Sequence, residues 1–465
     1  MGRPKKITKD LVTGSQKEIK AASTNTQENS PQEKESNLFK STFRHYGNSM
    51  VGLREFMSRL GPVVTELQHG IAKERENRFK EIMDDFASCA KKEDFKEFRK
   101  VLNKMLTLTK NHSASSKRGS VQIKSQVVGE CLLKLLKEAT THVREDIHRE
   151  LLNRSILMSL VSYFEVLVSE LAHAFYRIAP DSILTDDKVL SVKELKKFSS
   201  VDEALRFIVS HRVEELLWGD INDWEKFFYS RMKIDMKMIL DNWAQFEEYF
   251  QRRHIMLHAG GHVTERYLSN VDWEKLRPYM NKPALGTKLD ITDEYLENSI
   301  NAFEICGLLL CQEVWRKLIP GDNEHRFSSD SGLLDVIYQR LLGRQWYVSE
   351  YLSAWGDKDP EASEEGILIC KFNRWLSIKR QGRWSDVEKH VENFDCSAKN
   401  IKYSIARASL LEQSDEFFHL LPKVIGTDIP ISALKEWPIL DEMRNDPRFS
   451  EVLKKAEEAE PTPQK

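Results

Sequence analysis

The chain has 465 residues, of which 40% are hydrophobic and 31% are charged. This composition is that of a folded globular protein, and the length suggests about three domains. The net charge of −2 excludes the class of nucleic-acid-binding proteins whose whole surface is basic. Any contact with nucleic acid therefore depends on a local basic patch. The six cysteines form no C-x-x-C pair, which argues against a zinc ribbon and suits a reducing cytosol.

The N-terminal third of the chain is predicted to contain no catalytic chemistry. Residues 1–36 are rich in Lys, Gln, Ser, Asn and Glu, lack aromatic residues, and are expected to be disordered. They show no apolar stretch of the kind that a signal peptide has. Residues 37–150 repeat apolar residues every three or four positions, which predicts a helical N-terminal block, with a polar loop at 111–120.

The strongest helical pattern covers residues 151–175. The face expected to be buried consists of Leu157, Leu160, Val161, Phe164, Leu167, Val168, Leu171 and Phe175. Glu165 and Glu170 interrupt this segment, so it lacks the roughly 18 uncharged residues of a membrane span. We therefore expect a cytoplasmic protein without a membrane partner.

Helix-start and helix-stop signals mark out the middle of the chain. Ser200 with Glu203 is a capping box that predicts a helix start. A helix is predicted from about residue 238 to residue 259, where Gly260-Gly261 ends it. Thr292 or Asp293 is expected to cap the last helix of this region.

Residues 321–332 are predicted to be a linker, and residues 333–460 to form paired helices. Turns at Gly382 and Gln413 lie roughly 30 residues apart, near the period of tetratricopeptide-like arrays. No run of alternating strands occurs. The sequence thus predicts an all-α, multidomain protein with a C-terminal α-solenoid-like array.

The helix predicted at 238–259 carries polar residues where apolar ones are expected. Its apolar stripe consists of Ile239, Trp243, Phe246 and Phe250. Steps of four, three and four keep these residues on one face. The next positions on that face are 253 or 254 and then 257, which are Arg253, His254 and Leu257, with His258 beside them. Burial of an unpaired guanidinium is costly, so Arg253 either meets an acid or faces a cleft that receives an anion.

Three readings of these polar residues are open. In the first, Arg253 pairs with a carboxylate such as Glu165, and the histidines are packing residues. In the second, His254, His258 and His262, spaced by four, bind a metal, although Gly260-Gly261 is expected to break the helix before His262. In the third, the arginine holds a phosphate and the histidines move protons.

The stretch from Arg253 to His258 fits the R-x(4–6)-H motif of HEPN domains, with a polar residue directly after the arginine. The following "HAGGHVTERYL", the "SYFE" at 162–165 and the "GTKLDITDEYLENSI" at 286–300 also resemble segments of that family. The resemblance covers residues 151–320 and implies a helical bundle that dimerises. Ala259 replaces the asparagine that often follows the histidine in this family.

This resemblance implies a metal-independent endoribonuclease without a cofactor, of the kind found among prokaryotic toxins and anti-phage effectors. Arg253 would bind the scissile phosphate, His258 would act as general base or acid, and His254 would assist. The RNA 2′-hydroxyl would be the nucleophile, so a proton acceptor and a fixed cation suffice. The partners expected are RNA, a second copy of the chain and a regulatory protein on the C-terminal array.

Helix geometry favours a composite site. Five residues along an ideal helix separate Arg253 from His258 by about 140° and roughly 7.5 Å. One rigid helix therefore does not aim both side chains at one atom unaided, whereas a two-fold partner can supply the second set. The alternative is a non-catalytic adaptor that dimerises through the bundle and binds proteins through the C-terminal array.

Overall fold

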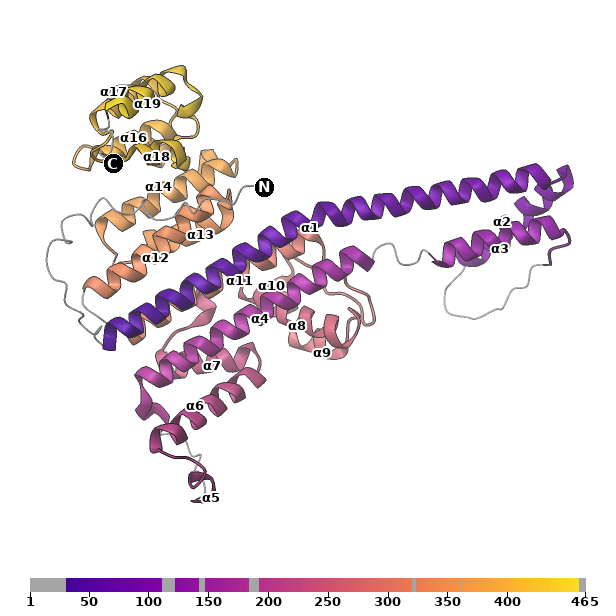
Figure 1. Cartoon of the computed structure of the whole chain (residues 1–465), viewed down its shortest axis with the longest axis horizontal. Coiled ribbons are helices and arrows are strands. Elements are labelled where there is room, and N and C mark those ends of the chain that lie inside the picture. The colour runs from indigo at the N-terminus through magenta and orange to yellow at the C-terminus, as the bar shows by residue number, and fades with distance from the viewer. Residues whose placement is uncertain are drawn as a thin grey trace, which may run out of the picture.

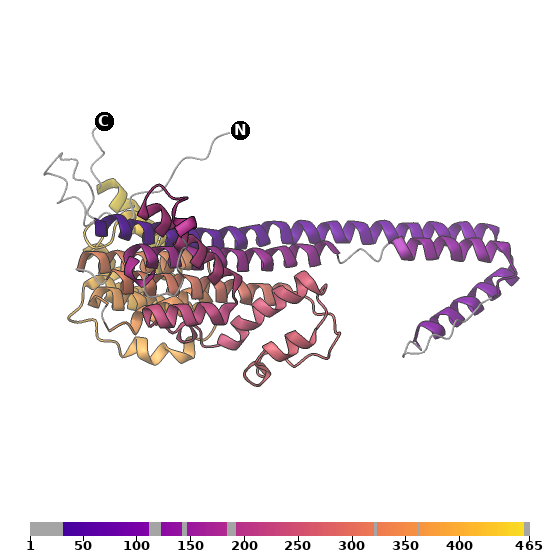
Figure 2. The same ribbon diagram turned by 90° about the horizontal axis from the view of Figure 1, so that it is seen from below.

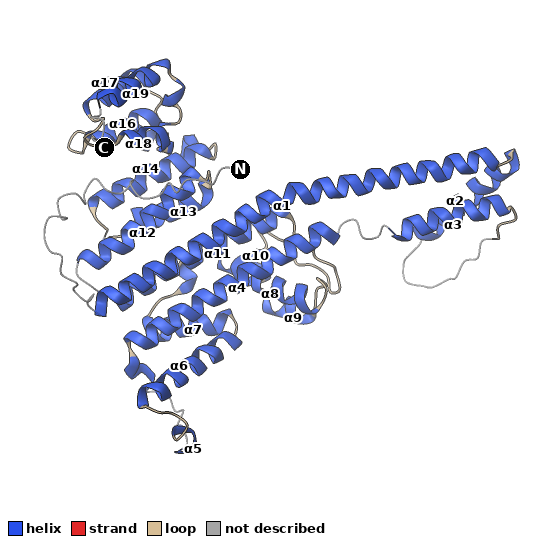
Figure 3. Cartoon of the chain, viewed as in Figure 1, coloured by secondary structure: helices blue, strands red, loops and turns tan. Residues whose placement is uncertain are grey.

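The computed structural model of the chain describes residues 31–110, 122–141, 147–183, 192–319, 323–360 and 362–459. Within these residues the fold contains nineteen α-helices and no strand (Figure 3). The all-α class predicted from the sequence is therefore confirmed. Of the residues expected to be disordered, 1–30 lie outside the described residues, whereas 31–36 begin the first helix.

An arm extends from the body of the protein (Figures 1 and 2). It consists of the second half of α1 (Pro31–Cys89), α2 (Lys92–Lys110) and α3 (Gln126–Thr141). The end of α1 and α3 run antiparallel, because ion pairs join Arg78 to Glu138 at 3.4 Å and Asp85 to Lys134 at 3.6 Å. The predicted polar loop at 111–120 lies outside the described residues. The arm has a small core of its own, formed by Phe86, Phe98, Val101, Val128, Cys131 and Leu132.

The first half of α1 belongs to the main core of the body. The α1 side chains buried there are Phe39, Phe43, Tyr46, Met50 and Leu53. They pack with α4 (Ile147–Ile178) and α11 (Asp293–Leu318), which lie alongside α1 (Figure 1). Residues on both sides of the boundary predicted near residue 150 therefore belong to one hydrophobic core, since α1 precedes that boundary and most of α4 follows it.

Helix α4 is the central helix of this body. All eight residues predicted for its buried face are buried, as the apolar period requires. By length and composition, α4 could cross a membrane, but 50% of its most apolar window is buried inside the protein. That burial is the behaviour of a core helix, because the apolar face is already covered by α1, α11 and α8 (Trp243–His258).

A buried carboxylate joins three helices of the body. Glu304 of α11 is fully buried and accepts hydrogen bonds from Arg54 of α1, with Nη2 at 2.6 Å, and from Nε of Arg340 on α12 (Asn323–Leu342). Arg54 also donates to Asn301 at 2.6 Å. A buried charge is tolerated only when it is paired and hydrogen-bonded, so this triad defines how α1, α11 and α12 meet.

Helices α1 and α11 approach closely at a glycine. A Cβ atom on Gly307 would lie 2.2 Å from the ring of Tyr46, a distance that no side chain can occupy. The Tyr46 hydroxyl donates to the carbonyl of Phe303 at 2.6 Å, one helical turn earlier. The absence of a side chain at 307 therefore allows the tyrosine to lie flat against the backbone of α11.

Shorter helices follow α4 on one side of the body (Figure 1). They are α5 (Val192–Leu195), α6 (Val201–Trp218) and α7 (Ile221–Met232). The predicted cap at Ser200 is confirmed, because its side chain accepts from the backbone N–H of Glu203. The Glu203 carboxylate turns back to the N–H of Ser199, at 2.7 Å, which satisfies a second donor at this helix start.

The C-terminal region is a succession of helical hairpins. Its helices are α12 (Asn323–Leu342), α13 (Trp346–Asp357), α14 (Glu364–Arg380), α15 (Glu388–Glu392), α16 (Ile401–Leu410), α17 (Ser414–Leu420), α18 (Ile431–Glu436) and α19 (Pro447–Ala459). Three of its turns share a left-handed residue, at Arg344, Gly382 and Glu412. In each turn, the residue that follows the left-handed one donates its backbone N–H to the carbonyl five residues earlier, as in a Schellman motif. The recurrent turn supports a repeated design, and the tetratricopeptide-like assignment stays a prediction.

The linker predicted at 321–332 is wrong for residues 323–332, which form the first half of α12. Residues 320–322 lie outside the described residues. The polar sequence favours a loop, but Gly332 lies against α1, where a Cβ would be 3.8 Å from the ring of Phe43. Packing of α12 on α1 and α11 stabilises a helix that local propensity alone does not indicate.

Replacement of Glu304 by glutamine tests the buried triad. The variant leaves the buried guanidinium of Arg340 and the part-buried one of Arg54 without a counter-charge, and we expect the free energy of unfolding to fall by about 3–5 kcal/mol. Urea unfolding followed by circular dichroism measures the change. The control is Glu297→Gln on the exposed face of the same helix, which we expect to shift stability by less than about 0.5 kcal/mol. Equal effects of the two variants would contradict the role of the triad.

Candidate functional site

The site helix α8 (Trp243–His258) begins later than the sequence predicts. Asn242 caps it by accepting from the N–H of Gln245, and Met236–Met238 instead form a short 3-10 turn that Asp235 caps. Two capping residues thus start two separate segments where one helix was expected. The predicted stop is confirmed, because Gly260 and Gly261 have left-handed φ angles of 58° and 85°.

The buried arginine of α8 is Arg252, whose neighbour Arg253 lies towards solvent. The Arg252 side chain is 3% exposed, and its Nε donates to Oε1 of Glu248 at 2.9 Å. Its Nη1 donates to the carbonyl of Asp290 at 3.0 Å. The guanidinium also lies 4.5 Å from the ring centre of Tyr295. Burial opposes the charge of Arg252, but the neighbouring Tyr295 and Glu248 raise its pKa above the ordinary value, so it stays protonated.

Glu248 is the centre of this network. Its carboxylate is 1% exposed and accepts from the hydroxyls of Tyr295, at 2.7 Å, and of Tyr267. Tyr267 lies on α9 (Glu265–Asn270) and Tyr295 on α11. One carboxylate therefore holds α8, α9 and α11 together and determines which face of α8 points outward.

Arg253 forms the ion pair that the first sequence reading considers, but it is not sealed. Its Nη2 lies 3.6 Å from Oε1 of Glu165 on α4, and the two side chains are 32% and 31% exposed. Its Nε is buried and makes no hydrogen bond. Burial raises the pKa of Glu165, and the charge of Arg253 partly offsets that rise. The guanidinium thus has one loosely held acid and remains accessible to an anion.

The two histidines lie next to each other on the same open face. The ring centres of His254 and His258 are 4.7 Å apart. His258 is exposed and His254 is half-buried. Leu257, which was expected to continue the buried stripe, is 49% exposed, so that expectation is wrong. The buried positions at this end of the helix are Arg252, Ile255 and Met256, because α8 is rotated by its attachment to Glu248.

The segment after α8 folds back beside it. Thr264 caps α9, and α10 (Trp273–Leu276) follows. Residues 286–289 then bond to residues 261–263: the N–H of Val263 donates to Thr287 and the N–H of Leu289 donates to Gly261, both at 2.9 Å. A Cβ on Gly261 would lie 3.2 Å from the Leu289 carbonyl, so a glycine suits this close approach.

The metal reading of the three histidines has no support in the geometry. His262 lies beyond the helix end, is exposed, and places Nδ1 3.1 Å from the carbonyl of Ala259. In the part of the chain that the structure describes, no group of three or more His, Cys, Asp or Glu side chains is arranged to hold a metal ion. His254 and His258 are therefore brought together without His262.

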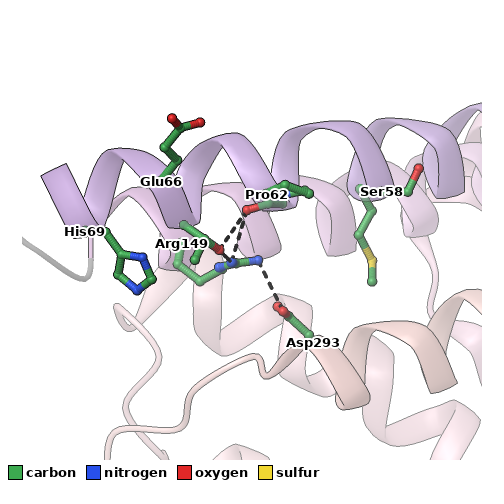
Figure 4. Close-up of a pocket in the computed structure, with 9 residues that line it drawn as sticks. Ser58, Pro62, Glu66, His69, Arg149 and Asp293 are labelled. Carbon is green, nitrogen blue, oxygen red and sulfur yellow. Dashed lines mark hydrogen bonds and ion pairs between the residues drawn. The ribbon is translucent and has the colours of Figure 1, made fainter.

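A pocket on another part of the protein does not include the site residues. It lies where α1 meets the starts of α4 and α11, beside Pro62 (Figure 4). Arg149 projects into it and donates to the Gly61 carbonyl at 3.2 Å, to Asp293 at 3.1 Å and to the Thr65 hydroxyl (Figure 4). The guanidinium already has three acceptors, so the pocket provides a joint between helices and no free cation for a ligand.

Sequence reasoning missed the network around Glu248 and the presence of Arg266 beside the histidines. The pair Glu248 and Arg252, four residues apart on a helix, was a visible signal. Arg266 lies close to His254. Burial is the main cause that lowers the pKa of His254, and the nearby side chains of Arg266, His258 and Arg253 lower it further. His254 is therefore uncharged at neutral pH and able to accept a proton.

The two adjacent arginines are expected to differ sharply in their effect on stability. Arg252→Gln removes the partner of a buried carboxylate, so the free energy of unfolding should fall by about 3–5 kcal/mol. Arg253→Gln is its matched control, because a part-exposed ion pair contributes only about 0–1 kcal/mol. Denaturant unfolding of both variants measures this. A larger loss for Arg253→Gln would mean that the wrong arginine is assigned to the core.

His254 is expected to titrate below its ordinary pKa of about 6.5. Because the unfolded chain takes up this proton first, the free energy of unfolding should fall as the pH drops from about 6.5 through the folded-state pKa. A titration of the ¹³C-labelled imidazoles by NMR measures the pKa, and His254→Asn should remove this part of the pH dependence. Titration at or above 6.5 would contradict the crowding of positive charge around His254.

Comparison with known proteins leaves most of the chain unmatched. No family model and no solved structure matches it. It is 32% identical over 124 residues to elongation factor Ts of Helicobacter pylori strain 26695, which covers 25% of this chain and 32% of that protein. Elongation factors Ts of strains Shi470 and HPAG1 are 31% and 29% identical over similar lengths. The chain spans about a third of the length of these relatives, which is too little to show membership of their family.

Proposed function

We propose that the protein is a metal-independent endoribonuclease of the HEPN type, acting in the cytoplasm as a toxin or an anti-phage defence effector. The observation that carries the proposal is the shared open face at the end of α8. There an accessible guanidinium, Arg253, adjoins two imidazoles whose ring centres are 4.7 Å apart. A fixed cation next to proton-transfer groups is what cleavage by the RNA 2′-hydroxyl requires.

The reaction needs one proton acceptor and one proton donor. An imidazole takes the proton of the 2′-hydroxyl, the 2′ oxygen forms a bond to phosphorus, and the bond from phosphorus to the 5′ oxygen breaks. The leaving 5′ oxygen receives a proton from a protonated imidazole, so the products are a 2′,3′-cyclic phosphate and a 5′-hydroxyl. In this scheme His258 is general base or acid, His254 assists as an uncharged acceptor, and Arg253 stabilises the charge that develops on the phosphate.

The surface around these residues suits a second copy of the chain. Leu257 is exposed beside His258, and Tyr163 and Val166 are exposed on either side of Glu165 on α4. Exposed apolar side chains close to polar site residues are a feature of interfaces. A two-fold contact here would bring two sets of Arg253 and His258 together, which supplies the convergence that one helix lacks.

The C-terminal hairpins provide a route for regulation by a partner protein. The hydroxyl of Tyr351 on α13 accepts from the N–H of Asp241 at 3.0 Å and donates to the carbonyl of Ile239 at 2.8 Å. Both bonds end on the segment that leads into α8. A protein bound to these hairpins could therefore change the position of the site helix.

A second candidate function is a non-catalytic adaptor. It is favoured by the ion pair between Arg253 and Glu165, which satisfies the guanidinium within one subunit, and by partial similarity to proteins named as elongation factors. In this reading the bundle dimerises and the C-terminal array binds proteins. The two functions differ in whether an anion displaces Glu165 from Arg253.

RNA cleavage in the presence of EDTA separates the two functions. The full-length protein is expected to cleave unpaired RNA to products with 2′,3′-cyclic phosphates. His258→Ala should lower the rate at least about a hundredfold, the effect of losing one general acid or base, with helicity and oligomeric state unchanged. His173→Ala, an exposed histidine on α4, is the matched control. If the wild type leaves every RNA intact, including with partner proteins present, the adaptor function is correct.

A further inference from the structure

The surface of α8 that carries the histidines continues away from the helix end as a polar strip. The strip consists of Glu247, Gln251, His254 and His258, whose spacing of four, three and four places them on one face. The chain reverses at Gly260 and Gly261, so α9 and α10 return beside α8, and Figure 1 shows α9 next to α8.

Contacts along the strip define which residues face each other. Asn270 at the end of α9 donates to the side chain of Gln251 at 3.4 Å. Further back along α8, burial raises the pKa of Glu247 and Lys275 of α10 is close enough to lower it. With this antiparallel register, the α9 residue one turn before Asn270 faces the α8 residue one turn after Gln251. These two residues are Arg266 and His254.

The backbone of Arg266 is held in place while its side chain is free to bind. The next residue, Tyr267, is buried and bonded to Glu248, and Thr264 caps the start of α9. The Arg266 side chain is exposed, and no ion pair among the described residues involves it. Beside the two histidines the face thus holds two guanidinium groups, and among the described residues only Arg253 has an ion pair, with Glu165. The positive charge of Arg266 therefore favours an anionic ligand.

We propose that Arg266 binds the phosphate next to the scissile one, so that the site takes single-stranded RNA of at least two phosphodiesters. This inference rests on the proposed ribonuclease function. Arg253 on α8 and Arg266 on α9 lie on different helices, and both are close to His254. Each guanidinium can therefore take a phosphate of its own. A guanidinium binds a phosphate with charge-assisted hydrogen bonds and without reading the base, so Arg266 contributes affinity and register and no sequence preference.

Substrate length provides the sharpest test. A dinucleotide has one phosphodiester and offers Arg266 nothing to bind, whereas a trinucleotide has two. Arg266→Gln is therefore expected to lower kcat/KM for the trinucleotide about tenfold, mainly through KM, and to lower kcat/KM for the dinucleotide much less. Arg266→Lys should restore part of the loss. Equal effects on the two substrates, or no effect on either, would overturn the proposal.

Binding measured without cleavage separates this inference from the catalytic one. A 2′-O-methyl trinucleotide cannot be cleaved, and its affinity for the full-length protein is measured over a range of salt concentrations. Arg266→Gln should reduce the slope of log affinity against log salt by about 0.7, the value for one phosphate contact on a single strand. Arg206→Gln on α6, an equally exposed arginine, should leave the slope unchanged. If Arg266→Gln leaves the slope unchanged, the proposal is refuted. If Arg266→Gln reduces the slope as expected but the wild-type protein cleaves no RNA, only the ribonuclease function is refuted.

Discussion

The buried carboxylate of Glu248 is the constraint on which the candidate site depends. A charge in a protein interior is stable only with a charged partner and full hydrogen bonding, and Glu248 obtains both from Arg252, Tyr267 and Tyr295. These partners come from α8, α9 and α11. The rotation of α8 follows from this attachment, and with it the outward position of Arg253 and the two histidines.

A second buried carboxylate, Glu304, has the corresponding role on the other side of α11. It joins α1 and α12 through Arg54 and Arg340, so the N-terminal arm and the C-terminal hairpins are both anchored to the body that carries the site. Both carboxylates lie on or against α11, which is buried along most of its length. A movement of the arm or of the hairpins would therefore be transmitted to α8 through α11, because closely packed helices have few alternative arrangements.

The proposed ribonuclease function requires an RNA phosphate to compete with Glu165 for Arg253. Glu165 holds this guanidinium at 3.6 Å with about a third of each side chain exposed, a geometry that contributes little net stability in water. A phosphodiester can accept two parallel hydrogen bonds from a planar guanidinium through the two non-bridging oxygens that share its charge, which makes it a stronger partner than one distant carboxylate oxygen. The raised pKa of Glu165, caused by burial, makes the release of this acid less costly still.

The sequence by itself determined the all-α class, the buried face of α4, the cap at Ser200 and the stop at Gly260, because helix period and cap chemistry are local. It left the cap of α11 open between Thr292 and Asp293, and the structure shows Thr292. It also placed Arg253, His254 and His258 at the end of one helix. The tertiary structure alone decided which of two adjacent arginines is buried, that Leu257 is exposed, and that residues 323–332 are helical. These outcomes depend on Tyr295, Phe43 and other residues far along the chain, and a periodic pattern contains no information about such partners.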